Sequence, residues 1–155
     1  MQEKIKVHFW SEKNSEQSIQ DMKYATENSA AVDIRCAEDF SVKPNENKMI
    51  RTGLCVSIPD GYCMKIYPRS GLSAKTDLIF KNTTGIIDSD YRGREIFVIW
   101  YNLGIDEVVF KKGDRVAQAM IERIIPVEYI EVDSIDTLKE FGNDRGGGLG
   151  STGLK

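Results

Sequence analysis

Two short segments carry the side chains best suited to chemistry. Pro68 to Ser73 follows an expected strand and precedes a short helical turn. Ser70 and the first backbone N–H groups of that turn could therefore bind an anion, with Arg69 adding charge. A plain N-cap at Ser70 is the alternative, and both interpretations stay open.

Gly85 to Gly93 places two carboxylates and an aromatic ring in one turn. These aspartates either form the turn or supply a general base or ion ligand, beside a ring that could pack on a sugar or a base.

Three further polar residues stand in or beside apolar runs. Asp33 lies within a β-rich run and, if buried, needs a partner, most simply an arginine. Gln118 lies inside the apolar run Val116 to Ile121 and needs a polar partner or a ligand. Asp114 follows a glycine in a turn, which favours a structural role.

The composition argues against several classes of function. The formal charge of −3, from 21 Lys plus Arg against 24 Asp plus Glu, argues against nonspecific duplex binding. The single histidine, His8, is expected to face solvent, so a histidine-clustered metal site is excluded and a Ser-His-Asp triad is disfavoured. The three cysteines lack the spacing of a zinc site, and their odd number disfavours a disulfide framework. Any catalysis must therefore use carboxylates, arginines, backbone amides or a bound ion.

No targeting or anchoring signal is expected in this chain. The first ten residues contain no apolar signal core, and no apolar run reaches 18 residues. We therefore expect an intracellular, cytoplasmic protein with no membrane partner.

The elements that must position these residues are short strands. A chain of 155 residues fits one domain. Turn residues separate β-rich runs at 5–9, 31–36, 49–58, 62–67, 95–101, 107–110, 116–121 and 127–132. Helical pieces are expected only near 71–75 and 134–140. The pattern predicts an all-β sandwich, jelly roll or barrel. From residue 141 the chain becomes glycine-rich, which is typical of a mobile tail that could order onto a polyanion.

Taken together, in this order and spacing, these segments resemble the five motifs of the trimeric-type dUTPases, the deoxyuridine triphosphate nucleotidohydrolases. The resemblance runs from about Ile5 to the C-terminus. The motifs correspond to Ser29 to Ile34, Pro68 to Leu72, Gly85 to Gly93, Gly113 to Gln118 and Arg145 to Gly153.

The resemblance implies a fold and an assembly. Residues 1–140 would form a distorted jelly-roll-like β-barrel, and residues 141–155 a flexible C-terminal arm that closes over the active site. Members of this family form homotrimers with active sites at subunit interfaces. No nucleic-acid partner is expected.

The resemblance also implies the reaction, which is hydrolysis of dUTP to dUMP and pyrophosphate. This reaction limits uracil incorporation into DNA and supplies dUMP for thymidylate synthesis. Asp88 would be the general base for in-line attack of water on the α-phosphorus. Mg²⁺, held mainly by the triphosphate, would keep waters near Asp33. The implied substrate-binding residues are Arg69, Ser70, Gly71, Asn82, Gly85, Ile87, Tyr91, Gln118, Arg145, Leu149, Gly150 and Ser151. Among these, Asn82 would meet uracil, Tyr91 would pack against deoxyribose and Arg145 would reach the γ-phosphate.

The sequence departs from the family pattern at several points. Leu149 stands where the family has a phenylalanine that stacks on uracil, and the stretch from Arg145 to Leu149 is one residue shorter. Weaker capping of the base is expected, because leucine lacks a π face. Motif one has Ala31 where glycine is usual. The strand after Gly93 is one residue longer, through Arg94, which predicts a bulge.

Two functions other than that of an active dUTPase bear on this sequence. A dCTP deaminase-like enzyme is disfavoured, because Gly85 to Gly93 resembles the hydrolase motif and no deaminating glutamate is evident beside it. A nucleotide-binding or regulatory protein, in which the altered arm leaves catalysis poor, stays open.

Overall fold

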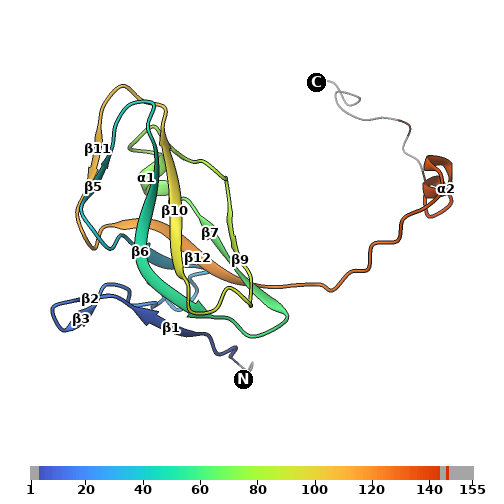
Figure 1. Cartoon of the computed structure of the whole chain (residues 1–155), viewed down its shortest axis with the longest axis horizontal. Helices are drawn as coiled ribbons and strands as arrows, with labels where there is room; N and C mark the ends of the chain where they lie inside the picture. Colours follow the sequence, from blue (N-terminus) through green and yellow to red (C-terminus); the bar gives the residue numbers. More distant parts are fainter. Residues whose placement is uncertain (1–3, 144–145, 147–155) are drawn as a thin grey trace. The chain divides into compact units, whose positions relative to one another are not determined.

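The computed structural model describes residues 4–143 and residue 146. The chain divides into two compact units, Met1–Ile125 and Pro126–Lys155. The first unit is built almost entirely of short antiparallel strands (Figure 1). Its elements are β1 (His8–Ser11), β2 (Lys13–Asn14), β3 (Gln17–Ser18), β4 (Val32–Arg35), β5 (Phe40–Val42), β6 (Asn47–Ser57), β7 (Tyr62–Tyr67), α1 (Ser70–Ser73), β8 (Leu78–Phe80), β9 (Gly85–Ile87), β10 (Glu95–Asn102), β11 (Val108–Phe110) and β12 (Arg115–Arg123).

Two four-stranded sheets enclose the core of the first unit. One sheet has the order β1-β6-β10-β8 and the other β4-β12-β7-β9. Alternate side chains of β10 are buried, as expected for a strand with one face toward a core. Buried apolar residues of both sheets form a single cluster, which includes Ile34, Ile50, Ile66, Ile96, Trp100 and Val116. The predicted all-β class is confirmed.

The predicted barrel is not closed in the described part of the chain. β5 and β11 pair only with each other, so they add no strand to either four-stranded sheet. Backbone hydrogen bonds therefore do not run continuously from one four-stranded sheet to the other, and the barrel is not closed by them. The two sheets are held together by side-chain packing instead.

The register of β6 against β10 changes near Gly53. Glu95 pairs with Cys55 and Phe97 pairs with Arg51, so three residues of β6 face one residue of β10. The extra residues lie in β6. The bulge predicted for the segment through Arg94 is therefore wrong in its place, because the irregularity lies on the partner strand. Gly53 has φ +61, a backbone conformation that residues other than glycine rarely adopt.

Substituting Gly53 with alanine is expected to destabilise the fold by about 2 kcal/mol or more. The left-handed backbone becomes strained, and the added Cβ would lie 2.8 Å from the Cβ of Glu12. Thermal denaturation of the variant measures the loss. Gly61→Ala is the matched control, because Gly61 also has a positive φ but its added Cβ would meet nothing within 4 Å. Equal losses in the two variants would contradict the steric part of this account.

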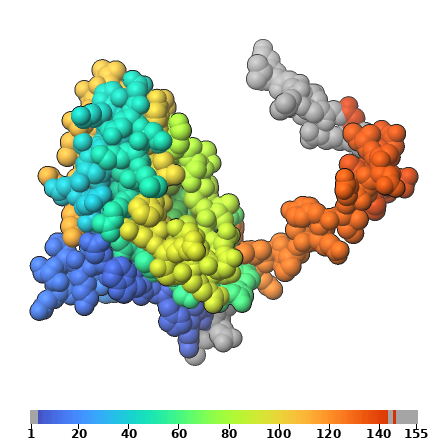
Figure 2. All heavy atoms as spheres, in the orientation of Figure 1, coloured from blue at the N-terminus to red at the C-terminus, as the bar shows by residue number. Residues whose placement is uncertain are grey.

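The N-terminal hairpin β2–β3 (blue in Figure 2) follows β1, and Glu12, between β1 and β2, donates its N–H to the carbonyl of Gly53 on β6 at 2.7 Å. Gln20, which follows the hairpin, is buried and donates from Nε2 to the carbonyls of Arg35 and Thr52, each at 2.7 Å. Its Oε1 accepts from the N–H of Arg35 at 2.9 Å. These three hydrogen bonds of the buried amide join the segment after β3 to β4 and β6.

The second unit contains one short helix in its described part, α2 (Ile135–Lys139). The Ser134 hydroxyl caps it by accepting from the N–H of Thr137 at 3.3 Å, so the predicted helix near 134–140 is confirmed. The strand predicted at 127–132 is wrong, because these residues form neither strand nor helix. Residues 127–131 are exposed, and no strand pairs with residues 127–132 in the described part of the chain. Neither helix in the described part of the chain is long and apolar enough to cross a membrane.

Candidate active site

The first group of site residues lies at one end of the β4–β12–β7 ladder. Asp33 on β4 is the register partner of Gln118 on β12, and Gln118 in turn is the partner of Tyr67 on β7. Arg69 follows β7 by two residues, so the strand delivers it to the same end of the sheet. We call Asp33, Arg69, Arg115 and Gln118 the Asp33 cluster.

Asp33 is paired on both carboxylate oxygens. Arg69 Nε lies 2.7 Å from Oδ1, and Arg115 Nη1 donates to Oδ2 at 3.2 Å. The expected arginine partner is thus confirmed, although the Asp33 side chain is partly exposed (25%) rather than buried. Arg115 was not assigned a role from the sequence. Arg115 directly follows the Asp114 turn and begins β12, the strand that pairs with the strand of Asp33. This position is the signal that could have identified it.

Ser70 and Gly71 form the first residues of α1, directly after Arg69. The N-cap position belongs to Arg69, and no side chain among the described residues caps it, so the plain N-cap interpretation of Ser70 is wrong. The hydroxyl of Ser70 is exposed and has no hydrogen-bond partner in the described part of the chain. Gln118 donates from Nε2 to the carbonyl of Pro68 at 2.9 Å, which confirms its polar partner and fixes the start of this loop.

The second group of site residues lies on the segment after β8. Asn82 is exposed in a turn, and β9 follows with Gly85 opposite Ile66 and Ile87 opposite Met64. The described residues of β9 pair with β7 and not with β8, the preceding strand in the chain. A Cβ at Gly85 would lie 3.3 Å from the Ile66 side chain, so glycine allows the two strands to approach closely.

Asp88 stands directly after β9 in a turn that several hydrogen bonds hold. Its carboxylate is exposed and has no hydrogen bond or ion pair with another described residue, while its carbonyl accepts from the N–H of Tyr91 at 3.2 Å. Arg92 ties the turn to its surroundings, donating to the carbonyl of Ser89 at 2.7 Å and to the carboxylate of Asp60 at 2.6 Å. The free carboxylate is thus presented on an ordered backbone. Asp114, by contrast, accepts from the N–H of Lys111 at 2.8 Å, as expected for a turn residue.

The two groups lie far apart within one chain. Asp33 and Asp88 belong to β4 and the end of β9, which are separated by three strand-to-strand steps in the same sheet. Three steps amount to about 14 Å, and the register from Tyr67 back to Met64 adds about 10 Å along the strands. One chain therefore does not bring Asp88 to the Asp33 cluster.

Comparison with known proteins identifies the family. The dUTPase family model matches residues 17–153.

The chain belongs to the dUTPase family.

Several curated members of the family are close in sequence. The chain is 42% identical over 135 residues to the deoxyuridine 5′-triphosphate nucleotidohydrolase of Hydrogenobaculum sp., covering 85% of this chain and 89% of the relative. It is 44% identical over 131 residues to the same enzyme of Nautilia profundicola, covering 84% and 88%. The prediction that the chain is an enzyme of this class is confirmed.

Solved structures of the family share the fold. A variant of the dUTPase of Staphylococcus bacteriophage 80alpha, bound to dUpNHpp, superposes with a TM-score of 0.76 at 25% identity, covering 96% of this chain and 99% of that one. A variant of the dUTPase of phage phi11 of S. aureus, described with a structural Mg(II) ion, gives 0.71 at 25% identity over 84% and 99%. The jelly-roll fold predicted for this dUTPase chain is confirmed, apart from the closure noted above.

A magnesium ion fits this chain only if the substrate supplies most of its ligands. Among the described residues no three His, Cys, Asp or Glu side chains come together as a metal cage. Both oxygens of Asp33 already face arginines. Mg²⁺ commonly keeps several waters and binds one carboxylate together with substrate phosphates, and Asp33 can meet that demand through water.

The three cysteines are all described, and all are free thiols. Cys36 and Cys63 are buried, and burial raises the pKa of the Cys36 thiol above its ordinary value. Desolvation and the nearby Glu95 carboxylate likewise raise the pKa of Cys55. A raised pKa keeps the thiols of Cys36 and Cys55 protonated, which disfavours a role for either as a nucleophile.

Four of the predicted substrate-binding residues lie outside the described residues: Arg145, Leu149, Gly150 and Ser151.

Proposed function

We propose that this chain hydrolyses dUTP to dUMP and pyrophosphate, with Asp88 as general base. The observation that carries the proposal is the exposed Asp88 carboxylate, held on an ordered turn with Tyr91, in a chain of the dUTPase family. Asp88 would take a proton from the water that attacks the α-phosphorus in line with the leaving pyrophosphate. An exposed carboxylate without a partner among the described residues is available to accept that proton.

The Asp33 cluster would bind the triphosphate. Ser70 offers a free hydroxyl, and the backbone of Ser70 and Gly71 opens α1, so both residues can donate to phosphate oxygens. Arg69 adds positive charge, while Asp33 and the Gln118–Pro68 hydrogen bond hold that loop in place. These contacts stabilise charge that grows on the leaving group.

Base and sugar would be read by the segment from Asn82 to Tyr91. The exposed Asn82 amide and the backbone of Gly85 and Ile87 would meet uracil. Tyr91 would pack against deoxyribose at the place where a ribose 2′-hydroxyl would clash. A wrong base would leave polar groups of the site unpaired, and a ribose would clash with Tyr91. These two effects discriminate between nucleotides more strongly than a missing methyl contact would.

Residues 141–155 would act as an arm that closes over bound nucleotide. Arg145 would reach the γ-phosphate, and Leu149, Gly150 and Ser151 would cover the base and the phosphates. An arm of this kind excludes water other than the attacking molecule.

The active site would be shared between copies of the chain in a homotrimer. The separation of Asp88 from the Asp33 cluster within one chain supports this assembly, because both groups must reach the same triphosphate. The exposed Ile86 side chain on β9 (61%) lies next to the Asp88 turn and offers apolar surface for a second copy.

Magnesium, when bound to the triphosphate, would neutralise charge on the phosphate oxygens. Asp33 would hold one of its waters. Chelation with EDTA is therefore expected to lower dUTP turnover by about tenfold or more, and added Mg²⁺ should restore it. Pyrophosphate release, measured before and after chelation, checks this. Full turnover in EDTA would contradict a magnesium requirement.

The point of attack can be tested with labelled water. In H₂¹⁸O, attack on the α-phosphorus places the label in dUMP and leaves pyrophosphate unlabelled. Mass spectrometry of both products reads the outcome. Label found in pyrophosphate would contradict attack at the α-phosphorus, and no products at all would contradict the hydrolase.

A further inference from the structure

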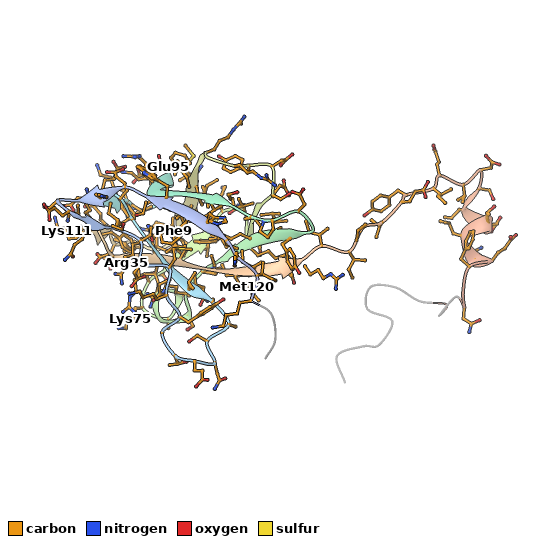
Figure 3. All side chains as sticks on the ribbon, turned by 90° about the horizontal axis from the view of Figure 1, so that it is seen from below. Phe9, Arg35, Lys75, Glu95, Lys111 and Met120 are labelled. Carbon is orange, nitrogen blue, oxygen red and sulfur yellow. The ribbon has the colours of Figure 1, made fainter. Side chains whose placement is uncertain are left out.

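The turn that carries Asp88 and Tyr91 is anchored through Glu95, the first residue of β10. The Tyr91 hydroxyl donates to the backbone carbonyl of Glu95 at 3.2 Å. Tyr91 is half-buried, and the Arg94 guanidinium lies 5.9 Å from the centre of its ring. The orientation of the ring therefore depends on where the backbone of Glu95, which Figure 3 labels, is held.

The side chain of Glu95 holds that backbone in place. Its Oε1 accepts from the N–H of Gly53 at 2.9 Å, and Oε2 accepts from both Nε and Nη2 of Arg51 at 3.2 Å. Arg51 is itself held, because the same Nη2 donates to Glu12 at 2.8 Å. The carboxylate thus receives three charge-assisted hydrogen bonds from β6, two of them from the charged guanidinium of Arg51.

These bonds lie where the β6–β10 ladder loses its register. Between the pairs Glu95–Cys55 and Phe97–Arg51, regular ladder bonds are interrupted by the surplus residues around Gly53. Thr52 satisfies the carbonyl of Ile96 through its hydroxyl at 2.6 Å. Side chains therefore replace backbone pairing at this point, and Glu95 fixes the start of β10.

We propose that Glu95, clamped by Arg51 and the Gly53 amide, is a positioning residue that sets the Tyr91 ring for discrimination between deoxyribose and ribose. The inference rests on the proposed function, in which Tyr91 packs against the sugar. Glu95 acts only through the Tyr91 hydroxyl and touches no substrate. Loosening Glu95 lets the ring turn, and a ribose 2′-hydroxyl then meets less steric resistance.

Binding of nonhydrolysable imido analogues of dUTP and UTP to the full chain tests this by calorimetry. Glu95→Ala is expected to reduce the preference for the deoxy analogue about tenfold. Glu95→Gln should lose less, because its amide oxygen can still accept from Gly53. Thermal denaturation shows whether each variant is folded, and Glu95→Gln serves if Glu95→Ala is not. An unchanged preference in a folded variant would overturn the proposal.

A double-mutant cycle separates positioning from a general structural effect. Tyr91→Phe removes the hydroxyl through which Glu95 acts. In the Tyr91→Phe background, Glu95→Ala is expected to leave the remaining preference unchanged. The same loss in both backgrounds would overturn the proposed route through Tyr91.

Hydrogen exchange gives a readout that needs no nucleotide. Amides of Asp88 to Gly93 are expected to exchange faster in Glu95→Ala than in the wild type. Glu46→Ala is the matched control, because it breaks another ion pair, with Lys48 at 3.9 Å, at the opposite end of the β6–β10 ladder. Unchanged exchange at the turn would overturn the anchoring. A wild type that binds neither analogue would contradict the proposed function, while the exchange result would still decide the anchoring.

Discussion

Replacing Asp88 with asparagine is expected to lower kcat for dUTP about a thousandfold, because the attacking water loses its general base. Asparagine keeps the size of the side chain and cannot accept the proton. Since the exposed Asp88 carboxylate forms no hydrogen bond or ion pair with another described residue, the substitution should leave the folded structure intact. Steady-state kinetics with thermal denaturation of the same sample check both parts. KM should change far less than kcat, because the lost interaction belongs to the transition state.

Asp90 provides the matched control in the same turn. Its side chain is also exposed, so Asp90→Asn removes an equivalent charge from the same surface. We expect a far smaller loss of kcat in this variant. A larger loss of kcat for Asp90→Asn than for Asp88→Asn would indicate that Asp90, and not Asp88, is the general base.

Mixing two inactive variants is expected to restore activity. One variant, Asp88→Asn, lacks the base, and the other, Arg69→Ala, lacks a phosphate-binding cation of the Asp33 cluster. If the two groups of one site come from different chains, random assortment of equal amounts leaves about a quarter of the sites intact. The mixture, after subunit exchange, should therefore recover about a quarter of wild-type turnover, against near-zero activity for each variant alone.

The control for the mixing experiment uses two substitutions in one group. Arg69→Ala mixed with Ser70→Ala should recover little, because both residues lie on the same loop of the same chain. Failure of the Asp88→Asn and Arg69→Ala mixture to recover, with subunit exchange verified, would contradict a site shared between copies.

Much of the fold could be predicted from local patterns. The β-rich runs of β10 and β12 identified those strands, and Ser134 marked the start of α2. The strands β8 and β9 were not predicted, because three residues are too few to show a period. The strand predicted at 127–132 shows the opposite error, since alternation indicates a strand but not whether a partner strand is present.

The polar residues of the site were predicted better than their geometry. Asp33 and Gln118 were singled out because polar groups in apolar runs need partners, and both have them. The role of Arg51 and Glu95 depends on a register shift between strands distant in sequence, which no local pattern reveals. The roles of Asp88 and Tyr91 stay predictions, because they require a substrate and a second copy.

Pyrophosphate release from dUTP, dCTP, dTTP and UTP, each with Mg²⁺, tests the central claim most directly. The account predicts rapid release from dUTP alone, and its loss in Asp88→Asn. Absence of release from every nucleotide by well-folded wild-type protein would contradict the hydrolase, and equal release from all four would contradict reading of the base and sugar by Asn82 to Tyr91.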